Sequence, residues 1–413
     1  FHQRVWIHAK RPTAMALVLL FSAASAAAAA AWSAQLRRRS KRRRVYMDGC
    51  FDMMHAGHFN ALRQASRCAE GAELVVGVVG DAEIVKAKGS APVIPEAERV
   101  EQVQLCRWVD EVLDDVPYDL HPSFVGELLG SRHRVDLVVH GDDPCLLPDG
   151  TDAYAEVKRQ GRFVEVPRTE GISSTDIVGR ILGHVARESA EAPQLLFTGA
   201  RVEEFRHGGE ACLPPPVGHT SPVVGYVDGA FDLCHVGHAT FLRMCREHCD
   251  VLIVGCHADG VVRERRRRQH AAARTREEAE ERAPLPLLSL HERCLALWAQ
   301  RAVSDVVVGA PLCATADLLA TLRVRKVFRG TVSEGSGLVG TGDRLDGLRK
   351  RRLVFDLKSP SSVTTHEVVR RVLNRKEEFE KRYETKSAKE AAYYFNKSSS
   401  RSPVNAESNR NGG

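Results

Sequence analysis

An internal duplication constrains this chain more than any other feature. Residues 45–58 read VYMDGCFDMMHAGH and residues 225–238 read GYVDGAFDLCHVGH, at an offset of 180 positions. Further matches follow in the same order, and residues 172–182 parallel residues 363–373 near the end of each copy. Because the matches keep one order over two long segments, they indicate two homologous domains.

Each copy alternates between strand and helix patterns. In the first copy, the expected strands are 45–47, 74–79, 111–113 and 135–139, and the expected helices are 55–67, 96–108 and 123–129. This alternation is typical of an α/β fold. We therefore predict two tandem domains, each a doubly wound, Rossmann-like parallel sheet.

The duplication and the composition divide the chain into five parts. We predict a membrane anchor or targeting segment at 1–43, a first domain at 44–187 and a second domain at 223–375. Residues 188–222 are rich in Pro, Gly and polar residues, so we expect a linker there. Residues 376–413 are expected to form a mixed-charge helix and then a disordered tail.

The N-terminal part has the pattern of a membrane segment. No charged residue occurs from 12 to 36, and seven basic residues follow at 37–44. An apolar helix of about 20 residues spans a bilayer core, and a basic run after it keeps the following domains on the cytosolic side. We favour an anchor; an organellar transit peptide is the main alternative, and a cleaved signal peptide fits less well.

Charge and cysteine usage exclude several classes of protein. The chain carries 59 Lys and Arg against 53 Asp and Glu, a net charge of +6. Because the basic run at 37–44 supplies this excess, no nucleic-acid-binding surface is expected. The 11 cysteines include no C-x-x-C pair and are expected to be free thiols in a reducing compartment. Ligands at zinc spacing are missing, so no metal site is predicted.

The pattern D-G-x-F-D-x-x-H-x-G-H recurs in both copies and carries two histidines three positions apart. In the first copy, His55 and His58 would project from the first turn of a helix, where amide groups and the helix dipole favour phosphate. Gly49 would let the backbone approach a ligand closely. A pair of capping or core histidines is the alternative, but the recurrence favours two imidazole donors for a nucleoside triphosphate.

Two further segments could reach the same ligand. Arg168 precedes Ser173, Ser174 and Thr175, which lead into a helical pattern and could form a second phosphate seat. Lys88 is expected in a polar loop from which it could swing onto phosphates. Taken alone, the first segment would be an ordinary capped helix and the second an ordinary solvated lysine.

Together these motifs resemble the cytidylyltransferase family, and the tandem arrangement resembles its ethanolamine-phosphate branch. The N-terminal part and residues 140–152 are similar to the plant and algal form. The resemblance implies that CTP and phosphoethanolamine give CDP-ethanolamine and pyrophosphate, with Mg²⁺, in phosphatidylethanolamine synthesis. It also implies attachment to the mitochondrial outer membrane rather than the endoplasmic reticulum, and it leaves a homodimer open.

The implied reaction needs no covalent nucleophile, so catalysis would rest on positioning and charge stabilisation. His55 and His58 would hold the triphosphate, while Lys88 and Arg168 would neutralise charge that grows in the transition state. The residues expected to line the nucleotide cleft are Gly49, Cys50, Phe51, His140, Gly141, Asp142, Asp143, Ser173, Ser174 and Thr175.

The resemblance also assigns roles around the two substrates. Residues 140–143 would lie near the cytosine and the ribose, and Asp48 would lie near the phosphoamine. Asp52 is expected to be a structural cap instead.

The second copy keeps both histidines but differs elsewhere. Matched residues of the two copies lie 178 positions apart before the segment that holds Lys88 and 194 positions apart after it. The second copy therefore has an insertion of 16 residues there, and this segment contains no Lys-Gly pair. An arginine run at 263–269 opens this long loop, and residues 359–362 replace Arg-Thr-Glu-Gly by Ser-Pro-Ser-Ser. The candidate nucleotide-binding residues are Ala230, Phe231, His235, His238, Arg329, Gly330, Thr364 and Thr365. We expect turnover only in the first domain; a second working site is the alternative.

Other functions fit the sequence less well. A choline-phosphate enzyme would use the same machinery, but that family resembles one catalytic domain followed by a long amphipathic helix. Here the residues after 375 mix both charges without a clear apolar face. Another H-x-G-H transferase would leave the duplication unexplained, and the intact motifs of the first copy argue against a regulatory pseudoenzyme.

Overall fold

The computed structural model describes residues 42–183, 199–206, 222–269, 286–332 and 346–387, apart from residues 144, 146, 148, 149 and 170. The expected anchor, except for its last two residues, lies outside this part, as do much of the expected linker and the expected disordered tail. Among the residues described, no helix combines the length and the apolar character needed to cross a membrane.

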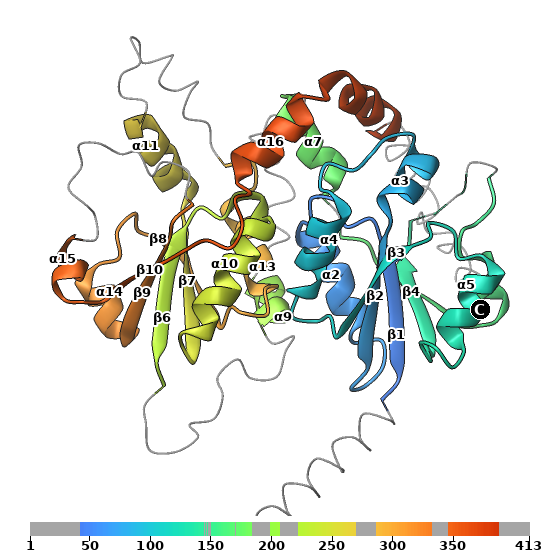
Figure 1. The fold of residues 1–413 in the computed structure, drawn as a ribbon, viewed down its shortest axis with the longest axis horizontal. Helices are drawn as coiled ribbons and strands as arrows, with labels where there is room; N and C mark the ends of the chain where they lie inside the picture. The colour runs from blue at the N-terminus through green and yellow to red at the C-terminus, as the bar shows by residue number, and fades with distance from the viewer. Residues whose placement is uncertain are drawn as a thin grey trace, which may run out of the picture.

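Each domain contains a five-stranded parallel sheet, as predicted (Figure 1). The first sheet has the order β3-β2-β1-β4-β5, from β1 (Arg44–Gly49), β2 (Glu73–Val79), β3 (Glu111–Val116), β4 (Leu137–Gly141) and β5 (Phe163–Val166). The second has the order β10-β9-β6-β7-β8, from β6 (Val224–Gly229), β7 (Val251–His257), β8 (Asp305–Ala310), β9 (Val324–Gly330) and β10 (Val354–Leu357). The strand order reverses beside β1 and β6, where ligands bind in such folds.

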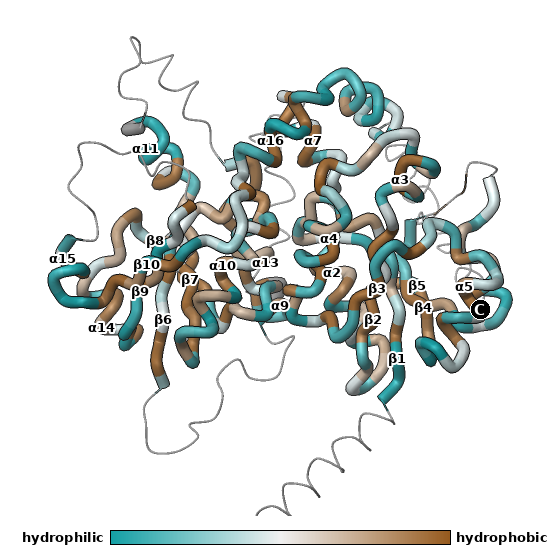
Figure 2. Tube along the Cα trace, viewed as in Figure 1, coloured by the Kyte–Doolittle hydropathy of each residue, from teal (hydrophilic) through white to brown (hydrophobic). Residues whose placement is uncertain are grey.

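Helices connect the strands and cover both faces of each sheet. The first domain contains α2 (Ala56–Ala65), α3 (Asp81–Lys88), α4 (Glu96–Gln104), α5 (Pro122–Leu129), α6 (Ala155–Arg159) and α7 (Ser174–Leu182). The second contains the 3-10 turn η2 (Asp232–Cys234) and α10 (Val236–Glu247), α11 (Asp259–Gln269), α13 (Leu290–Trp298), α14 (Ala316–Thr321), α15 (Asp346–Lys350) and α16 (Thr365–Leu373). Figure 2 shows hydrophobic residues along the strands and hydrophilic ones on the outlying α15.

One helix lies within the segment expected to be a linker. Helix α9 (Gly199–Arg206) places the fully buried Phe205 edge-on against Trp108, with ring centroids 5.3 Å apart. Glu204 of the same helix pairs with Arg63 of α2 at 3.1 Å. At least this part of the connection therefore belongs to the packed structure, because it covers an apolar surface between the domains.

The domains meet through equivalent elements, with α2 and α4 of the first facing α13 and α10 of the second (Figure 1). The Arg107 amide donates to the Ala299 carbonyl and the Arg301 amide donates to the Leu105 carbonyl, both at 2.9 Å. Residues 105 and 107 correspond to 299 and 301 in the aligned copies, so the two bonds are related by an approximate two-fold axis. The predicted helix at 96–108 stops at Gln104 because the chain beyond it pairs across the domains.

Two ion pairs repeat this symmetry. Arg180 of α7 contacts Glu292 of α13 at 3.1 Å, and Arg371 of α16 contacts Glu98 of α4 at 2.8 Å. Each pair joins the last helix of one copy to the middle helix of the other, as in a symmetric dimer. The first pair is the more buried, with both side chains 6% exposed.

A fully buried arginine closes the top of each sheet. Arg99 donates to the carbonyls of Val79, Cys50 and Ile94 at 2.6–3.0 Å and to the Asp81 carboxylate at 2.6 Å. The second domain repeats the four bonds with Arg293, whose acceptors are His257, Ala230, Leu288 and Asp259. The ends of β1 and β2 are thereby tied to α3 and α4.

We expect Arg99→Leu to lower the free energy of unfolding by about 3–5 kcal/mol, because it leaves several buried acceptors and one carboxylate unpaired. Arg293→Leu should have an effect of the same size in the second domain. Arg159→Leu is the control, since this side chain is 72% exposed and should leave the unfolding midpoint unchanged. Urea unfolding followed by fluorescence measures all three, and equal midpoints for Arg99→Leu and the control would contradict the assignment.

Candidate functional site

The predicted histidines lie at the carboxyl end of β1, where α2 begins. His55 caps α2, and its Nδ1 accepts from the Gly57 amide at 3.1 Å. The His55 amide in turn donates to Nδ1 of His58 at 3.4 Å, and the two rings lie 4.1 Å apart. Capping and ligand binding are thus compatible: with both Nδ1 atoms accepting, a neutral ring carries its proton on Nε2, from which it can donate to phosphate.

Both imidazoles are neutral at physiological pH. Burial lowers the pKa of His55 well below its usual range, and the neighbouring His58 lowers it further. Burial also lowers the pKa of His58 to about 3, with the positive charges of Lys386, Lys88 and Arg168 adding to the effect. Neutral rings donate hydrogen bonds without adding charge, so the positive charge for the triphosphate comes from lysine and arginine.

Lys88 is the last residue of α3, which corrects the expectation of a loop. The helix ends at Gly89, whose φ of 74° is in the left-handed region that favours glycine. The Lys88 ammonium donates to Sγ of Cys50 at 2.9 Å and lies 5.7 Å from the Tyr118 ring. A helix end fixes this cation beside the strand-end residue Cys50 better than a loop would.

Arg168 follows β5 and contacts the end of β4. Its amide donates to the Asp142 carboxylate at 3.0 Å, and its guanidinium lies 3.7 Å from the Asp143 carboxylate. The structure therefore brings together the predicted segment at 140–143 and the predicted cation. Across the crevice, Arg168 lies near enough to His55 for its charge to lower the pKa of that imidazole.

Asp48 lies at the end of β1 in a buried aromatic setting. The Tyr154 hydroxyl donates to its carboxylate at 2.7 Å, and the His140 ring lies tilted against the Tyr154 ring with centroids 4.5 Å apart. Burial raises the pKa of Asp48, while the Tyr154 hydrogen bond and His140 act in the opposite direction. Sequence reasoning missed Tyr154; the only signal was its position just after the segment at 140–152.

The serines at α7 have structural bonds of their own. Ser173 caps the helix by accepting from the Asp176 amide at 3.1 Å. The Ser174 hydroxyl donates to the Asp52 carbonyl at 3.0 Å, and Thr175 is buried beside it. What α7 offers to a ligand is therefore its N-terminal turn, held against the loop after β1, with the hydroxyls serving mainly to hold it there.

Asp52 is a structural cap, as expected. Its carboxylate accepts from the amides of residues 93 and 94, and Asp232 does the same for residues 287 and 288 in the second domain. These bonds fix the loop between β1 and α2 against the chain that precedes α4.

Gly49 lies against the ring of Phe51. A Cβ at this position would lie 3.3 Å from that ring, so the ring leaves little room for a side chain, and the close approach of a ligand stays a prediction. Phe51 has a φ of 48°, which turns the chain sharply after β1, and its ring lies 5.8 Å from that of His58.

Comparison with known proteins identifies the group to which the site belongs. A family model described as "Cytidylyltransferase-like" matches residues 46–180 and 226–334. An "Ethanolamine-phosphate cytidylyltransferase" of Arabidopsis thaliana is 40% identical over 382 residues, covering 86% of each chain. That of Dictyostelium discoideum is 36% identical over 372 residues, covering 84% of this chain and 95% of the other. The chain belongs to the ethanolamine-phosphate cytidylyltransferase family.

Similarity to choline-phosphate enzymes is confined to one domain. The human "Choline-phosphate cytidylyltransferase A" is 43% identical over 139 residues, which cover 34% of this chain and 36% of the other. Membership of the ethanolamine-phosphate family therefore rests on both copies, since its members align over the length of the tandem.

The second site of this family member has the same frame with different bonds. His235 and His238 stack 3.9 Å apart, but the His235 ring nitrogens and Nδ1 of His238 make no hydrogen bond to any described residue. The arginine run at 263–269 lies on α11 rather than in a loop, which corrects the expectation. Because α3 and α11 begin at aligned aspartates, Arg266 occupies the position of Lys88.

The remaining second-domain candidates lie around this frame. Phe231 packs 5.3 Å from His238, the Ala230 carbonyl accepts from the buried Arg293, and Arg329 is exposed at the end of β9. Arg329-Gly330 corresponds to His140-Gly141 of the first copy. There is little space for a side chain at Gly330, because a Cβ there would lie 2.8 Å from the Ser359 hydroxyl. Thr364 caps α16, and Thr365 donates to the Asp232 carbonyl.

The helix after residue 375 has an apolar contact that its sequence did not suggest. Residues 376–387 are helical, and Phe379 within them is 1% exposed, packed in a cluster with Met53 and Ile172 of the first domain. This single aromatic residue does not amount to an apolar face, but it attaches the helix to the domain. One residue is too little for a periodic pattern to reveal.

Proposed function

We propose that this chain transfers the cytidylyl group of CTP to phosphoethanolamine, giving CDP-ethanolamine and pyrophosphate. The observation that carries the proposal is the pair of neutral imidazoles at the N-terminus of α2, both with Nδ1 bonded to a backbone amide and the Nε2 side left for a ligand. The product is a phosphatidylethanolamine precursor, which agrees with the names of the relatives that align over both copies.

The chemistry requires only placement and charge. A phosphate oxygen of phosphoethanolamine attacks the α-phosphorus of CTP, a new O–P bond forms, and the bond to the bridging oxygen breaks so that pyrophosphate leaves with the electron pair. His55 and His58 donate from Nε2 to phosphate oxygens. Lys88 and Arg168 offset the negative charge that develops on the non-bridging and leaving oxygens in the transition state.

Asp48 suits the other substrate. Burial raises the pKa of Asp48 because it disfavours the charged carboxylate, and a cation placed beside the carboxylate would offset that cost. The ammonium of phosphoethanolamine is such a cation, and Tyr154 orients the carboxylate for it. The contact between the His140 and Tyr154 rings would bring the two substrates together, because residues 140–143 are proposed to bind the nucleotide.

Mg²⁺ would arrive with CTP. In the described ranges, no group of three or more His, Cys, Asp or Glu is placed to hold a metal ion. Mg²⁺ usually keeps several waters and binds through substrate phosphates, so a site without a protein cage fits it. When bound, the ion neutralises triphosphate charge and leaves the protein to position the phosphates.

The first prediction concerns substrate and site together. Protein lacking residues 1–36 should form CDP-ethanolamine from labelled CTP, and His58→Ala or Lys88→Ala should lower kcat by about 100-fold or more, since each removes transition-state stabilisation. Lys381→Ala, an exposed lysine far along the chain, is the matched control and should retain full rate. Equal or better turnover of phosphocholine would contradict phosphoethanolamine as the substrate. Near-normal rates in the two variants would contradict the proposed roles of His58 and Lys88.

The second prediction is that the two sites are unequal. The double variant His55→Ala with His58→Ala should abolish turnover, whereas His235→Ala with His238→Ala should cost much less. The reason is that backbone amides donate hydrogen bonds to Nδ1 of both first-domain histidines and orient them, while the second-domain histidines lack these hydrogen bonds. Both proteins should be checked for CTP binding by calorimetry. Two equally inactive, folded double variants would establish a second working site instead.

We further propose that residues 1–43 anchor the protein in the mitochondrial outer membrane, with the catalytic domains in the cytosol. The proposal rests on the charge-free stretch followed by seven basic residues. Tagged full-length protein should stay with membranes in carbonate, and added protease should digest its domains in intact organelles. Recovery of a shortened protein inside the organelle would establish a transit peptide. A homodimer of the full chain is a separate proposal, which light scattering of the purified protein would test.

A further inference from the structure

The helix at residues 376–387, here named the C-terminal helix, follows the second domain but packs on the first (Figure 1). Arg375 just before it donates to the carbonyls of Ala91 and Pro92 at 2.9 and 3.1 Å. Arg382 donates to the Ser90 hydroxyl at 3.3 Å, and Phe379 is buried between these two contacts. The helix is thus attached to the segment between α3 and α4, one wall of the first domain's crevice.

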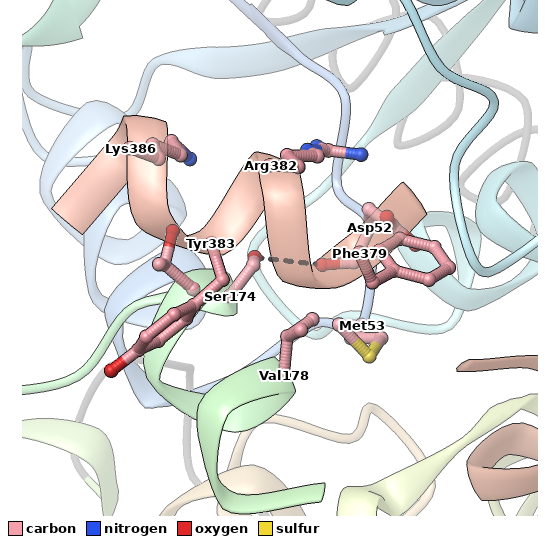
Figure 3. A pocket seen from close by; sticks show the side chains of 9 residues that line it. Asp52, Met53, Ser174, Val178, Phe379, Arg382, Tyr383 and Lys386 are labelled. Atoms are coloured by element: carbon pink, nitrogen blue, oxygen red, sulfur yellow. Dashed lines mark hydrogen bonds between the residues drawn. The ribbon is translucent and has the colours of Figure 1, made fainter. Parts of the chain in front are cut away.

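The same helix forms one side of a small pocket at the N-terminus of α7. Its lining combines first-domain and helix residues, among them Asp52, Ser174, Thr175, Phe379, Arg382 and Lys386 (Figure 3). Ser174 and Thr175 belong to the N-terminal turn of α7, which is the expected second phosphate seat. The pocket therefore places Lys386 beside that turn.

Lys386 is the pocket residue whose charge reaches the histidines. After burial, the positive charge of Lys386 is among the causes that lower the pKa of both His55 and His58. It shares a helix face with Arg382 and Phe379, which are held in place by the contacts above, so its approach to the site is fixed by the helix.

A triphosphate needs more positive charge than neutral imidazoles supply. Lys88 reaches the site from α3 and Arg168 from the end of β5, on the two sides of β1. Lys386 adds a cation from the direction of α7, where a phosphate at the helix N-terminus would lie.

We propose that Lys386 binds the phosphate chain of CTP, so that a helix following the second domain completes the catalytic site of the first. This rests on the proposed function, and it gives the second domain a role in turnover that does not require a reaction of its own. The partner of Lys386 is an oxygen of the β- or γ-phosphate, the part that leaves as pyrophosphate.

The test compares Lys386→Ala and Lys386→Arg with Lys381→Ala, the exposed lysine of the same helix. We expect Lys386→Ala to lower kcat/KM for CTP by about tenfold or more, because it removes a charged phosphate contact. Lys386→Arg should recover most of the loss, KM for phosphoethanolamine should stay constant, and Lys381→Ala should match the wild type. A wild-type rate in Lys386→Ala, or an equal loss in Lys381→Ala, overturns the proposal.

Phe379→Ala provides the second test, since it should release the helix without touching the ligand. It should reproduce the CTP defect, and adding Lys386→Ala to it should cause little further loss. Full additivity of the two changes would overturn the shared mechanism. If wild-type protein makes no CDP-ethanolamine, the proposed function fails; CTP binding by calorimetry, compared between wild type and Lys386→Ala, still decides this inference.

Discussion

A buried arginine at the top of each sheet is the interaction on which the rest of this protein depends. Arg99 binds carbonyls at the ends of β1 and β2 and the carboxylate at the start of α3. These groups carry Cys50, Lys88 and the loop to His55, so the guanidinium sets the distance between the lysine and the histidines. A planar fork with five fixed donors can do this, whereas a lysine could not.

Local and repeated patterns predicted the duplicated frame and the parallel sheets, because both depend on residues that lie close together or recur along the chain. Long-range packing was not predictable in the same way. Helix α9, the anchored Phe379 and the bond from Tyr154 to Asp48 each depend on a partner more than 90 residues away. The sequence does not reveal that Lys88 lies on a helix, because a Lys-Gly pair is as typical of a loop as of the helix end that Gly89 caps here.

The two copies show how one frame can give two electrostatic environments. Burial lowers the pKa of His238 to about 4 without further help, whereas three cations add to burial at His58. The backbone bonds that orient His55 have no counterpart at His235. The difference lies in what surrounds the shared motif, since the motif itself is retained in both copies.

The approximate two-fold contact between the copies has an evolutionary consequence. In a symmetric dimer of identical chains, one mutation alters the interface twice, and a residue on the axis must tolerate a copy of itself. Fusing both copies into one chain removes that restriction, and the position where Cys106 pairs with Gln300 already shows two unlike side chains at equivalent sites. Each half is then free to change without the other, while inheritance of both in a single gene keeps them in fixed proportion.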